Sequence, residues 1–325
     1  MTKNYDFTAQ EMQWIQDAKA KNATLVFPES EFSNRVTEAG EYIAKNGIAN
    51  VVFLGKSDEY VAKYNGTSIR AVNILNSELR DMLASCLYNK RKEKVMTIEE
   101  ANKTINDPVY FATMMVEMSL VDGMVAGAEI ATSATFKPAL QVIKARPNGR
   151  VSSFFAMLRG DEKYLLADCG LNIDPSAEEI ASFAIDTANS YRLLFHAEPR
   201  VALLSYSTYG SAGGDSAHKM IDAVNILKNS NVDFVFDGEM QLDSAVVPEV
   251  SKLKCPSSPI AGRANVFIFP DLASGNIGYK LMQRFGGFKA FGPIAQGFNK
   301  PVNDVSRGCT ASDVVMAGVI TILQI

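Results

Sequence analysis

Segments with the pattern of a strand alternate with segments with the pattern of a helix along most of this chain, and that alternation limits the folds it can adopt. Short apolar runs at 23–28 and 50–55 enclose residues 33–45, whose apolar side chains recur at helical spacing. Later strands are expected at 123–128, 200–207, 232–236 and 265–269, and later helices at 108–120, 135–144, 176–195, 216–229, 241–253, 276–285 and from 311. This order predicts an α/β protein with mainly parallel sheets covered by helices on both faces.

The alternation is interrupted after Pro147-Asn-Gly149. Two strand-like runs, 151–158 and 164–168, follow one another with the turn residues Arg-Gly-Asp-Glu between them, which predicts a hairpin. The chain has 325 residues, whereas one domain takes roughly 150. We therefore expect two α/β domains with a boundary near residue 150.

The charge balance and the hydropathy exclude several classes of partner. The net charge is −4 and the isoelectric point is near 5.4, which gives no support for the basic face that a nucleic-acid partner requires. The net charge does not exclude a local basic pocket that binds a phosphorylated small molecule. No apolar stretch reaches the roughly 20 residues of a membrane-spanning helix, and the polar N-terminus lacks the pattern of a signal peptide. We expect a cytoplasmic protein that binds no membrane.

Metal and nucleotide motifs are missing as well. The four cysteines are scattered and only two histidines occur, so we expect no metal site, and such cysteine usage fits a reducing compartment. Cys309 and Cys169 have no histidine near them in sequence and are interpreted as packing residues. Gly55-Lys-Ser57 lacks the earlier glycine of a phosphate loop, and no GxGxxG follows a strand.

Two polar segments at strand ends are candidate anion sites. The first, Ser205–Gly214, follows a strong strand and precedes a helix, where backbone N–H groups and hydroxyls can meet an oxyanion. The second is Gly127–Lys137. Each is equally readable as a plain loop or a helix-capping cluster. As sites, they would bind an anion such as phosphate through Ser207, Thr208, Gly210, Ser211, Thr132 and Ser133.

The segment Pro301-Val-Asn-Asp-Val-Ser-Arg-Gly308 and the residues after it carry the densest set of reactive groups. Arg307 can hold a phosphate as a fork, Ser306 can donate to an oxyanion, and Asp313 can accept a proton. A competing interpretation exists for Asp313, because Thr310-Ala-Ser-Asp313 fits a capping box. The local sequence alone favours the capping role. The basic run 90–94 reads locally as a solvated helix end.

Taken together, the motifs resemble one family, the phosphate acetyltransferases. The resemblance runs in order along nearly the whole chain, through Phe27-Pro-Glu29 with Arg35, Val121–Ala128, Val151-Ser-Ser153, Ala167-Asp-Cys169, Ser207-Thr208, Gly210-Ser-Ala212, Asp237-Gly-Glu239, Ala264–Asp271, Gly275-Asn276 and Pro301–Gly308. It implies a fold like that of isocitrate and isopropylmalate dehydrogenases. Residues 1–149 with 293–325 would form the first domain and 150–292 the second.

The resemblance also implies the reaction acetyl-CoA plus phosphate in equilibrium with CoA plus acetyl phosphate, by direct thiolate attack in a ternary complex. CoA, acetyl phosphate and inorganic phosphate would be the small-molecule partners, no cofactor would be bound permanently, and the protein would be a homodimer in acetate metabolism. A phosphate butyryl- or propionyltransferase is the alternative within the class. A dehydrogenase on the same fold and a non-catalytic partner-binding domain are the rivals outside it.

Site residues follow from the resemblance by position. Asp313 resembles the base that takes the proton of the CoA thiol, Ser306 the group that steadies the oxyanion, and Arg307 the residue that orients the acyl phosphate. Arg91 matches an arginine that binds CoA, which reverses the local interpretation of its basic run. Lys137 stands where the family has a second CoA-binding arginine, and lysine keeps the charge but loses the fork geometry.

Overall fold

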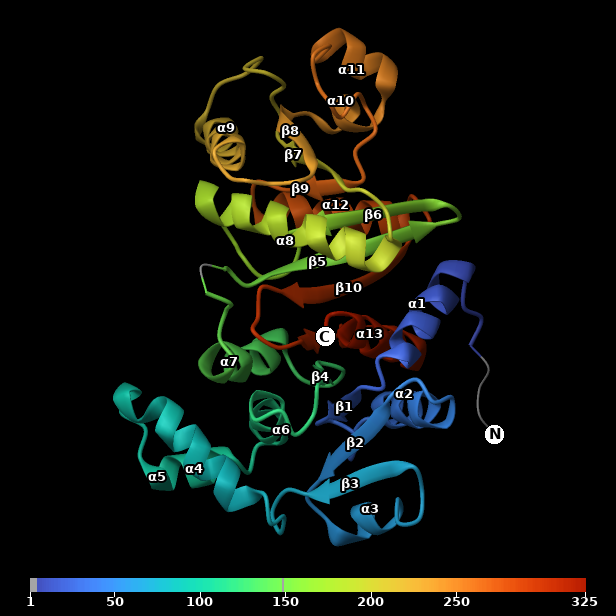
Figure 1. Ribbon diagram of the computed structural model, residues 1–325, viewed down its shortest axis with the longest axis vertical. Helices are drawn as coiled ribbons and strands as arrows, with labels where there is room; N and C mark the ends of the chain where they lie inside the picture. The colour runs from blue at the N-terminus through green and yellow to red at the C-terminus, as the bar shows by residue number, and fades with distance from the viewer. Residues whose placement is uncertain (1–4, 148) are drawn as a thin grey trace. The chain divides into compact units, whose positions relative to one another are not determined.

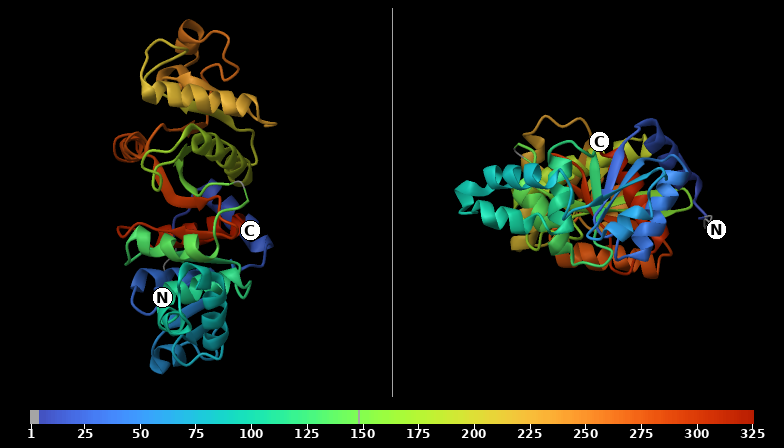
Figure 2. Two further views of the ribbon diagram at one scale, coloured as in Figure 1. Left: turned by 90° about the vertical axis from the view of Figure 1, so that its left-hand side faces the viewer. Right: turned by 90° about the horizontal axis from the view of Figure 1, so that it is seen from below.

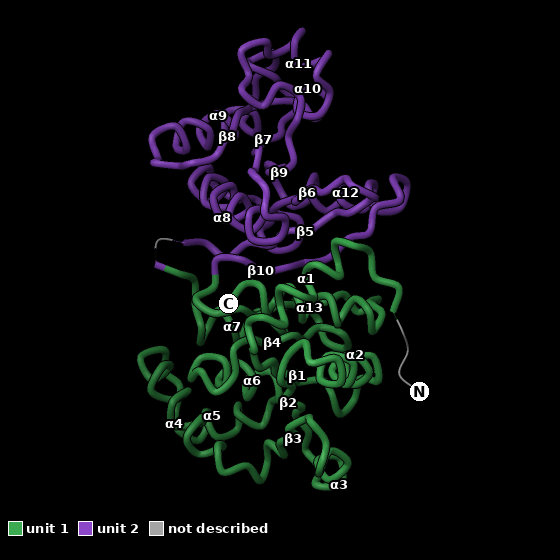
Figure 3. The backbone as a smooth tube through the Cα atoms, turned by 45° about the vertical axis from the view of Figure 1, so that its right-hand side comes forward, with its two compact units in different colours: residues 1–146, 298–325 green, residues 147–297 purple. Residues whose placement is uncertain are grey.

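The computed structural model describes residues 5–147 and 149–325, which fold into two compact units, residues 1–146 with 298–325 and residues 147–297 (Figure 3). Asn148, inside the predicted turn, lies outside the described residues. Compared with the predicted boundary at 292/293, the second unit extends further, to Gly297. The reason is β10 (Lys289–Gln296), which pairs along its length with β5 (Ser152–Arg159) and so belongs to the second unit.

The first unit is built on a five-stranded sheet in which every pairing is parallel (Figure 1). Its strand order is β11 (Val302–Asp304), β4 (Gly123–Ala126), β1 (Thr24–Phe27), β2 (Asn50–Gly55) and β3 (Ile69–Asn73). The last strand in sequence, β11, thus completes the sheet beside β4, with Asp304 in register with Ala126. The C-terminal segment therefore returns to the first unit to finish its sheet.

Helices cover both faces of this sheet (Figures 1 and 2). One face carries α2 (Asn34–Lys45) and α13 (Ala311–Leu323), with α1 (Ala9–Ala20) packed against α13. The other face carries α6 (Pro108–Glu117) and α7 (Thr132–Val142), with α4 (Arg80–Arg91), η1 (Lys92–Lys94) and α5 (Ile98–Thr104) beyond them. Helix α3 (Asp58–Ala62) packs on β2 and β3. Helix α13 is apolar on all sides because it lies between the sheet and two other helices. Its N-terminus points out of the core and carries Asp313.

The second unit has a mixed six-stranded sheet in the order β10, β5, β6 (Glu162–Ala167), β9 (Val266–Ile268), β7 (Arg200–Leu204) and β8 (Val235–Met240). β5 and β6 form the predicted antiparallel hairpin, and β6, β9, β7 and β8 are parallel. The helices are α8 (Ala177–Phe195), α9 (Asp215–Lys228), α10 (Leu242–Val246), α11 (Pro248–Lys254) and α12 (Leu272–Arg284). The predicted α/β class with mainly parallel sheets is confirmed.

Three predicted elements of this unit need correction. The strand expected at 232–236 lies at 235–240, because it runs through the polar stretch Asp237-Gly-Glu239 that apolar patterning cannot detect. The helix expected at 241–253 is two helices, since Pro248 ends the first and starts the second. The helix expected from 276 begins at Leu272, where Asp271 caps it. Strands β3, β10 and β11 were not anticipated.

Candidate active site

The loop between β11 and α13 exposes the three residues expected to do the chemistry. Ser306 and Arg307 are both exposed, and Asp313 lies three residues into α13. The Ser306 Oγ accepts a hydrogen bond from the Gly308 N–H at 3.2 Å, which leaves its hydroxyl proton available. The loop therefore presents a hydroxyl donor, a guanidinium and a carboxylate at the positive end of a long helix, an arrangement suited to anions.

Arg35, on α2, holds this loop by its backbone. Its Nη1 donates to the carbonyl oxygens of Arg307 and Cys309, each at 2.8 Å. Its Nη2 donates to the Ala128 carbonyl at 2.7 Å and to the Glu129 carboxylate at 2.8 Å. The ion pair also keeps the pKa of Glu129 below its usual value. Because the guanidinium binds main-chain oxygens, the loop is fixed while the side chains of Ser306 and Arg307 remain outside.

Asp313 caps α13, as the local sequence favoured. Thr310 is the N-cap residue, its Oγ1 accepts from the Asp313 N–H, and the Asp313 carboxylate accepts in return from the Thr310 N–H at 2.8 Å and from its hydroxyl at 2.9 Å. Both returned bonds use Oδ2. The carboxylate is exposed, so Oδ1 faces solvent without one of these capping bonds. Capping and proton transfer are therefore compatible in one residue.

Asp304, at the end of β11, is a functional candidate that sequence reasoning missed. It is 1% exposed, and its two carboxylate oxygens accept hydrogen bonds from the hydroxyls of Thr132 and Thr135, each at 2.7 Å. Burial raises the pKa of Asp304 to about 6, against the lowering effect of those hydroxyls and of the Arg307 charge. All three residues of β11 are buried, so a charged residue within that strand was the available signal.

The turn after β4 is shaped by a second buried carboxylate. Glu29, which is 0% exposed, accepts from the backbone N–H groups of Ala128, Glu129 and Ile130 at 2.8–3.1 Å. The N–H groups of this turn are thus occupied by a side chain of the protein. Of the two residues expected to bind phosphate here, Ser133 is exposed, whereas the Thr132 hydroxyl is engaged by Asp304.

The two expected CoA-binding residues lie on neighbouring helices of the first unit. Arg91 ends α4, and its charge acts on Tyr110, whose pKa burial raises and Arg91 partly restores. The Tyr110 hydroxyl donates to Gln141 at 2.8 Å, one turn beyond the exposed Lys137 on α7. The Arg91 Nε is buried and has no hydrogen-bond partner among the described residues. Both cations therefore stand on the same side of this unit.

The loop after β7, in the second unit, uses most of its hydroxyls internally. Ser207 is buried and donates to Glu239 at 2.7 Å, and the Thr208 Oγ1 accepts from the Gln241 N–H at 2.9 Å. The Gly210 N–H also donates to Glu239, at 2.8 Å. Ser211 is exposed and accepts from the Thr208 N–H at 3.0 Å, so its own hydroxyl proton faces outward. Only Ser211, of these predicted residues, offers a hydroxyl to a ligand as the loop stands.

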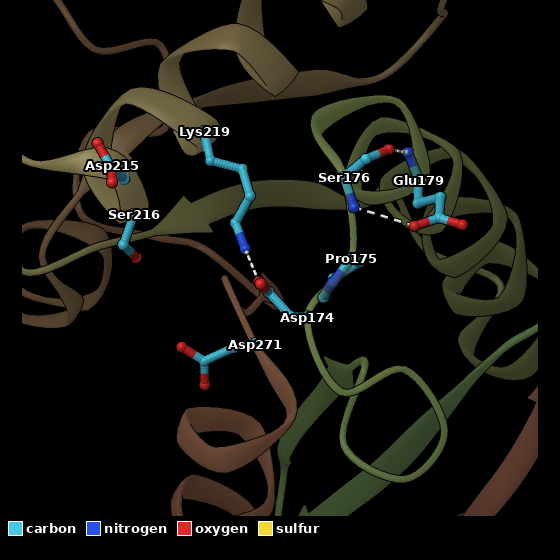
Figure 4. Close-up of a pocket in the computed structure, with 8 residues that line it drawn as sticks. All are labelled: Asp174, Pro175, Ser176, Glu179, Asp215, Ser216, Lys219 and Asp271. Atoms are coloured by element: carbon cyan, nitrogen blue, oxygen red, sulfur yellow. Dashed lines mark hydrogen bonds and ion pairs between the residues drawn. The ribbon is translucent and has the colours of Figure 1, made fainter.

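A surface pocket with a volume of about 530 Å³ also lies in the second unit, at the starts of α8, α9 and α12 (Figure 4). Its eight lining residues are Asp174, Pro175, Ser176, Glu179, Asp215, Ser216, Lys219 and Asp271, which include none of the predicted site residues. Lys219 reaches across it to pair with Asp174. Four carboxyl groups against one paired lysine make it a poor site for phosphate.

Burial raises the pKa of the Cys309 thiol to about 11 and that of Cys169 well above its usual value, so neither is poised as a thiolate nucleophile.

Within residues 5–147 and 149–325, no three His, Cys, Asp or Glu side chains gather as a metal ion would require. In the same ranges no helix combines the length and the apolar character needed to traverse a bilayer.

A hydroxyl, a guanidinium and a carboxylate exposed at a helix start of an α/β fold suit the class of enzymes that act on small anionic substrates. Within that class, the family described as phosphate acetyl/butaryl transferase matches residues 11–322, and the chain belongs to this family. The expectation of an acyltransferase of this group is confirmed.

Individual relatives agree with this assignment. A phosphate acetyltransferase from Acetivibrio thermocellus is 45% identical over 322 residues, which are 96% of this chain and 97% of that protein. The structure of a phosphotransacetylase from Streptococcus pyogenes matches with a TM-score of 0.93 and 40% identity over 98% of this chain and 99% of that chain. A 4-hydroxythreonine-4-phosphate dehydrogenase from Klebsiella pneumoniae, with a TM-score of 0.51 over 92% of this chain and 99% of that chain, is 11% identical and shares the fold alone.

Proposed function

We propose that this chain catalyses the reversible transfer of an acetyl group between coenzyme A and phosphate, so that acetyl-CoA plus phosphate is in equilibrium with CoA plus acetyl phosphate. The observation that carries the proposal is the β11–α13 loop, whose backbone is tied to Arg35 while Ser306, Arg307 and one oxygen of Asp313 face outward. Family membership and the phosphate acetyltransferases among the relatives support the same reaction.

In this mechanism Asp313 accepts the proton of the CoA thiol. A free thiol has a pKa of about 8.5 and is mostly protonated at neutral pH, so a base is needed to form the thiolate. The thiolate attacks the carbonyl carbon of acetyl phosphate, and Ser306 donates a hydrogen bond to the oxyanion that forms. When the intermediate collapses, the C–O bond to phosphate breaks, and phosphate leaves with the electron pair while Arg307 holds its oxygens. The thiol proton stays on Asp313 until solvent removes it.

The remaining binding roles are assigned to two cations of the first unit and to exposed hydroxyls. Arg91 and Lys137 contact the phosphates of CoA, because they are cations placed on one side of the first unit. Ser133 and Ser211 keep outward hydroxyls for the acyl phosphate or phosphate, and Gly210 beside Ser211 gives the ligand close access to the loop backbone. The hydroxyls of Thr132, Ser207 and Thr208 are engaged within the protein and act by shaping these loops.

The protein acts as a homodimer in the cytoplasm. An apolar row supports a subunit interface; it is formed by Ile277 and Leu281 on α12 and by Phe285 directly after the helix, with exposed fractions of 59%, 51% and 88%. All four cysteines are free thiols, which fits a reducing compartment. Sedimentation equilibrium of the wild type and of Phe285→Asp tests the dimer, and a monomeric wild type would contradict it.

The test of the activity is CoA-dependent thioester formation, followed by ultraviolet absorbance, with acetyl, propionyl and butyryl phosphate compared in parallel. We expect the highest kcat/KM with acetyl phosphate and no requirement for an added nicotinamide nucleotide. Absence of turnover with all three acyl phosphates would refute the enzyme assignment. Highest kcat/KM with butyryl phosphate would move the chain to the other branch of its family.

A further inference from the structure

Asp304 connects two segments that the proposed reaction needs in a fixed arrangement. It lies two residues before Ser306, and its carboxylate oxygens each accept a hydroxyl from the first turn of α7, Oδ2 from Thr132 and Oδ1 from Thr135. Helix α7 carries Lys137 on its next turn. One buried carboxylate thus joins the loop with the reacting groups to the helix with an expected CoA contact.

The start of α7 has no cap from its own N-cap residue. Its N-cap residue is Ala131, which has no side-chain oxygen and makes no capping bond. The first N–H groups of a helix carry partial positive charge and are stabilised by a nearby anion. Asp304 places an anion from a distant segment beside this helix start, where its oxygens accept from the Thr132 and Thr135 hydroxyls.

The space around Asp304 is shaped to admit its carboxylate. A Cβ atom on Gly127 would lie 2.0 Å from the Asp304 Oδ1 and 2.7 Å from the Val305 carbonyl oxygen. The φ angle of Gly127 is +97°, a backbone conformation that residues with a side chain rarely adopt. The close approach of β4 to Asp304 therefore depends on a residue without a side chain.

The buried negative charge of Asp304 destabilises the folded protein and interacts with the positive charge of Arg307. Burial raises the pKa of Asp304 to about 6 and the negative charge of Glu29 adds to the rise, whereas the hydroxyls and the positive charge of Arg307 lower it. A buried carboxylate that destabilises the fold but interacts with a reacting arginine is the pattern of a group kept for function.

We propose that Asp304 is a positioning residue for acyl transfer, whose carboxylate fixes the Ser306–Arg307 loop and the start of helix α7 in one arrangement. The inference rests on the proposed function. It predicts that the carboxylate affects turnover through Arg307 and affects CoA binding through α7, although Asp304 itself is too buried to touch either substrate.

The test begins with Asp304→Asn, which keeps the shape of the side chain. An amide can accept one threonine hydroxyl and donate to the other, so both hydrogen bonds survive and only the charge is lost. We expect kcat for acetyl transfer to fall about 10- to 100-fold, as for a displaced reacting group, while Tm at pH 8 stays equal or rises. Thr135→Val should raise the KM for CoA several-fold, and Thr135→Ser, which restores the hydroxyl, should return it to the wild-type value.

Glu11→Gln is the matched control. Glu11 is also a buried carboxylate of the first unit that accepts a threonine hydroxyl at a helix start, on α1, which carries none of the site residues. We expect it to lower Tm and leave kcat and KM near the wild-type values. Asp304→Asn with wild-type kcat, or with losses in kcat and Tm that Glu11→Gln reproduces, would overturn the inference. An inactive wild type would instead refute the proposed function.

Discussion

Two polar loops that follow parallel strands, one after β11 and one after β7, are both candidate sites by sequence, and the structure separates them. The loop after β11 keeps its main chain bound to Arg35 and turns Ser306 and Arg307 outward. The loop after β7 does the reverse, because Ser207 is turned inward and bonded to Glu239. A reactive loop differs from a purely structural one in which of its polar groups are already hydrogen-bonded within the protein. A count of serines and threonines carries no such information.

Asp313→Ala is the change with the largest expected effect on the loop after β11. We expect kcat to fall more than about 10³-fold, because proton removal from the thiol is lost, and stability to fall by about 1 kcal/mol, because the cap is lost. Steady-state kinetics and thermal melting measure the two effects. Glu100→Ala, which breaks the same capping motif on α5, should show the stability loss alone. Near-normal kcat with earlier melting in Asp313→Ala would leave capping as its whole role.

Ser306→Ala sharpens the comparison with the second loop. The loss of one oxyanion donor typically lowers kcat about 10²- to 10³-fold, and we expect a loss in that range. The side chain is exposed, so the melting temperature should barely change. A variant that melted several degrees lower with unaltered kcat would show that Ser306 supports structure only.

The pH dependence of stability tests the buried charge of Asp304. Its folded pKa is raised to about 6, above the unfolded value, so the linked stability is fully present below the unfolded pKa and is lost as pH rises through about 6. The free energy of unfolding of Asp304→Asn, relative to that of the wild type, should therefore increase by up to roughly 3 kcal/mol between pH 4 and pH 8. Urea unfolding across this range measures the gap between the two proteins. A gap independent of pH would contradict the raised pKa.

Ser207→Ala is the counterpart of Ser306→Ala in the second unit. Removal of a buried hydroxyl that donates to a carboxylate should lower the free energy of unfolding by about 1–3 kcal/mol. The expected change in kcat/KM is much smaller than that of Ser306→Ala, since the hydroxyl does not face a ligand. Paired urea melts and kinetics of the two variants measure this reversal. If Ser207→Ala lost turnover at unchanged stability, the contrast between the loops would be broken.

Cys309→Ala should have the smallest effect. With the pKa of its thiol raised to about 11 by burial, the residue is almost never a thiolate at neutral pH. We expect kcat and KM within about twofold of the wild-type values, because the residue packs and takes no covalent part. A fall in kcat of about 10²-fold or more in Cys309→Ala, at unchanged Tm, would argue for a covalent role.

Sequence reasoning recovered the fold class from periodicity and the reactive loop from its residue types, since both are local properties. It did not anticipate β10 and β11, because their polar and glycine-containing stretches lack the apolar run of a buried strand. It also missed Asp304, whose importance depends on two threonines about 170 residues earlier in the chain. For the same reason it could not predict that the Ser207 hydroxyl donates its hydrogen bond to Glu239. Contacts between distant segments are the part that local patterns leave undetermined.

The return of β11 to the first sheet also bears on how the protein is made. The second unit, residues 147–297, is continuous and can fold as soon as it has left the ribosome. The first unit has to wait, with the edge of β4 unpaired, until residues 302–304 are synthesised. Arg35 gains its carbonyl partners at 307 and 309 only after the whole second unit has been synthesised. The first sheet and the loop that carries Ser306 and Arg307 are therefore completed after the second unit, although most of the first unit is made before it.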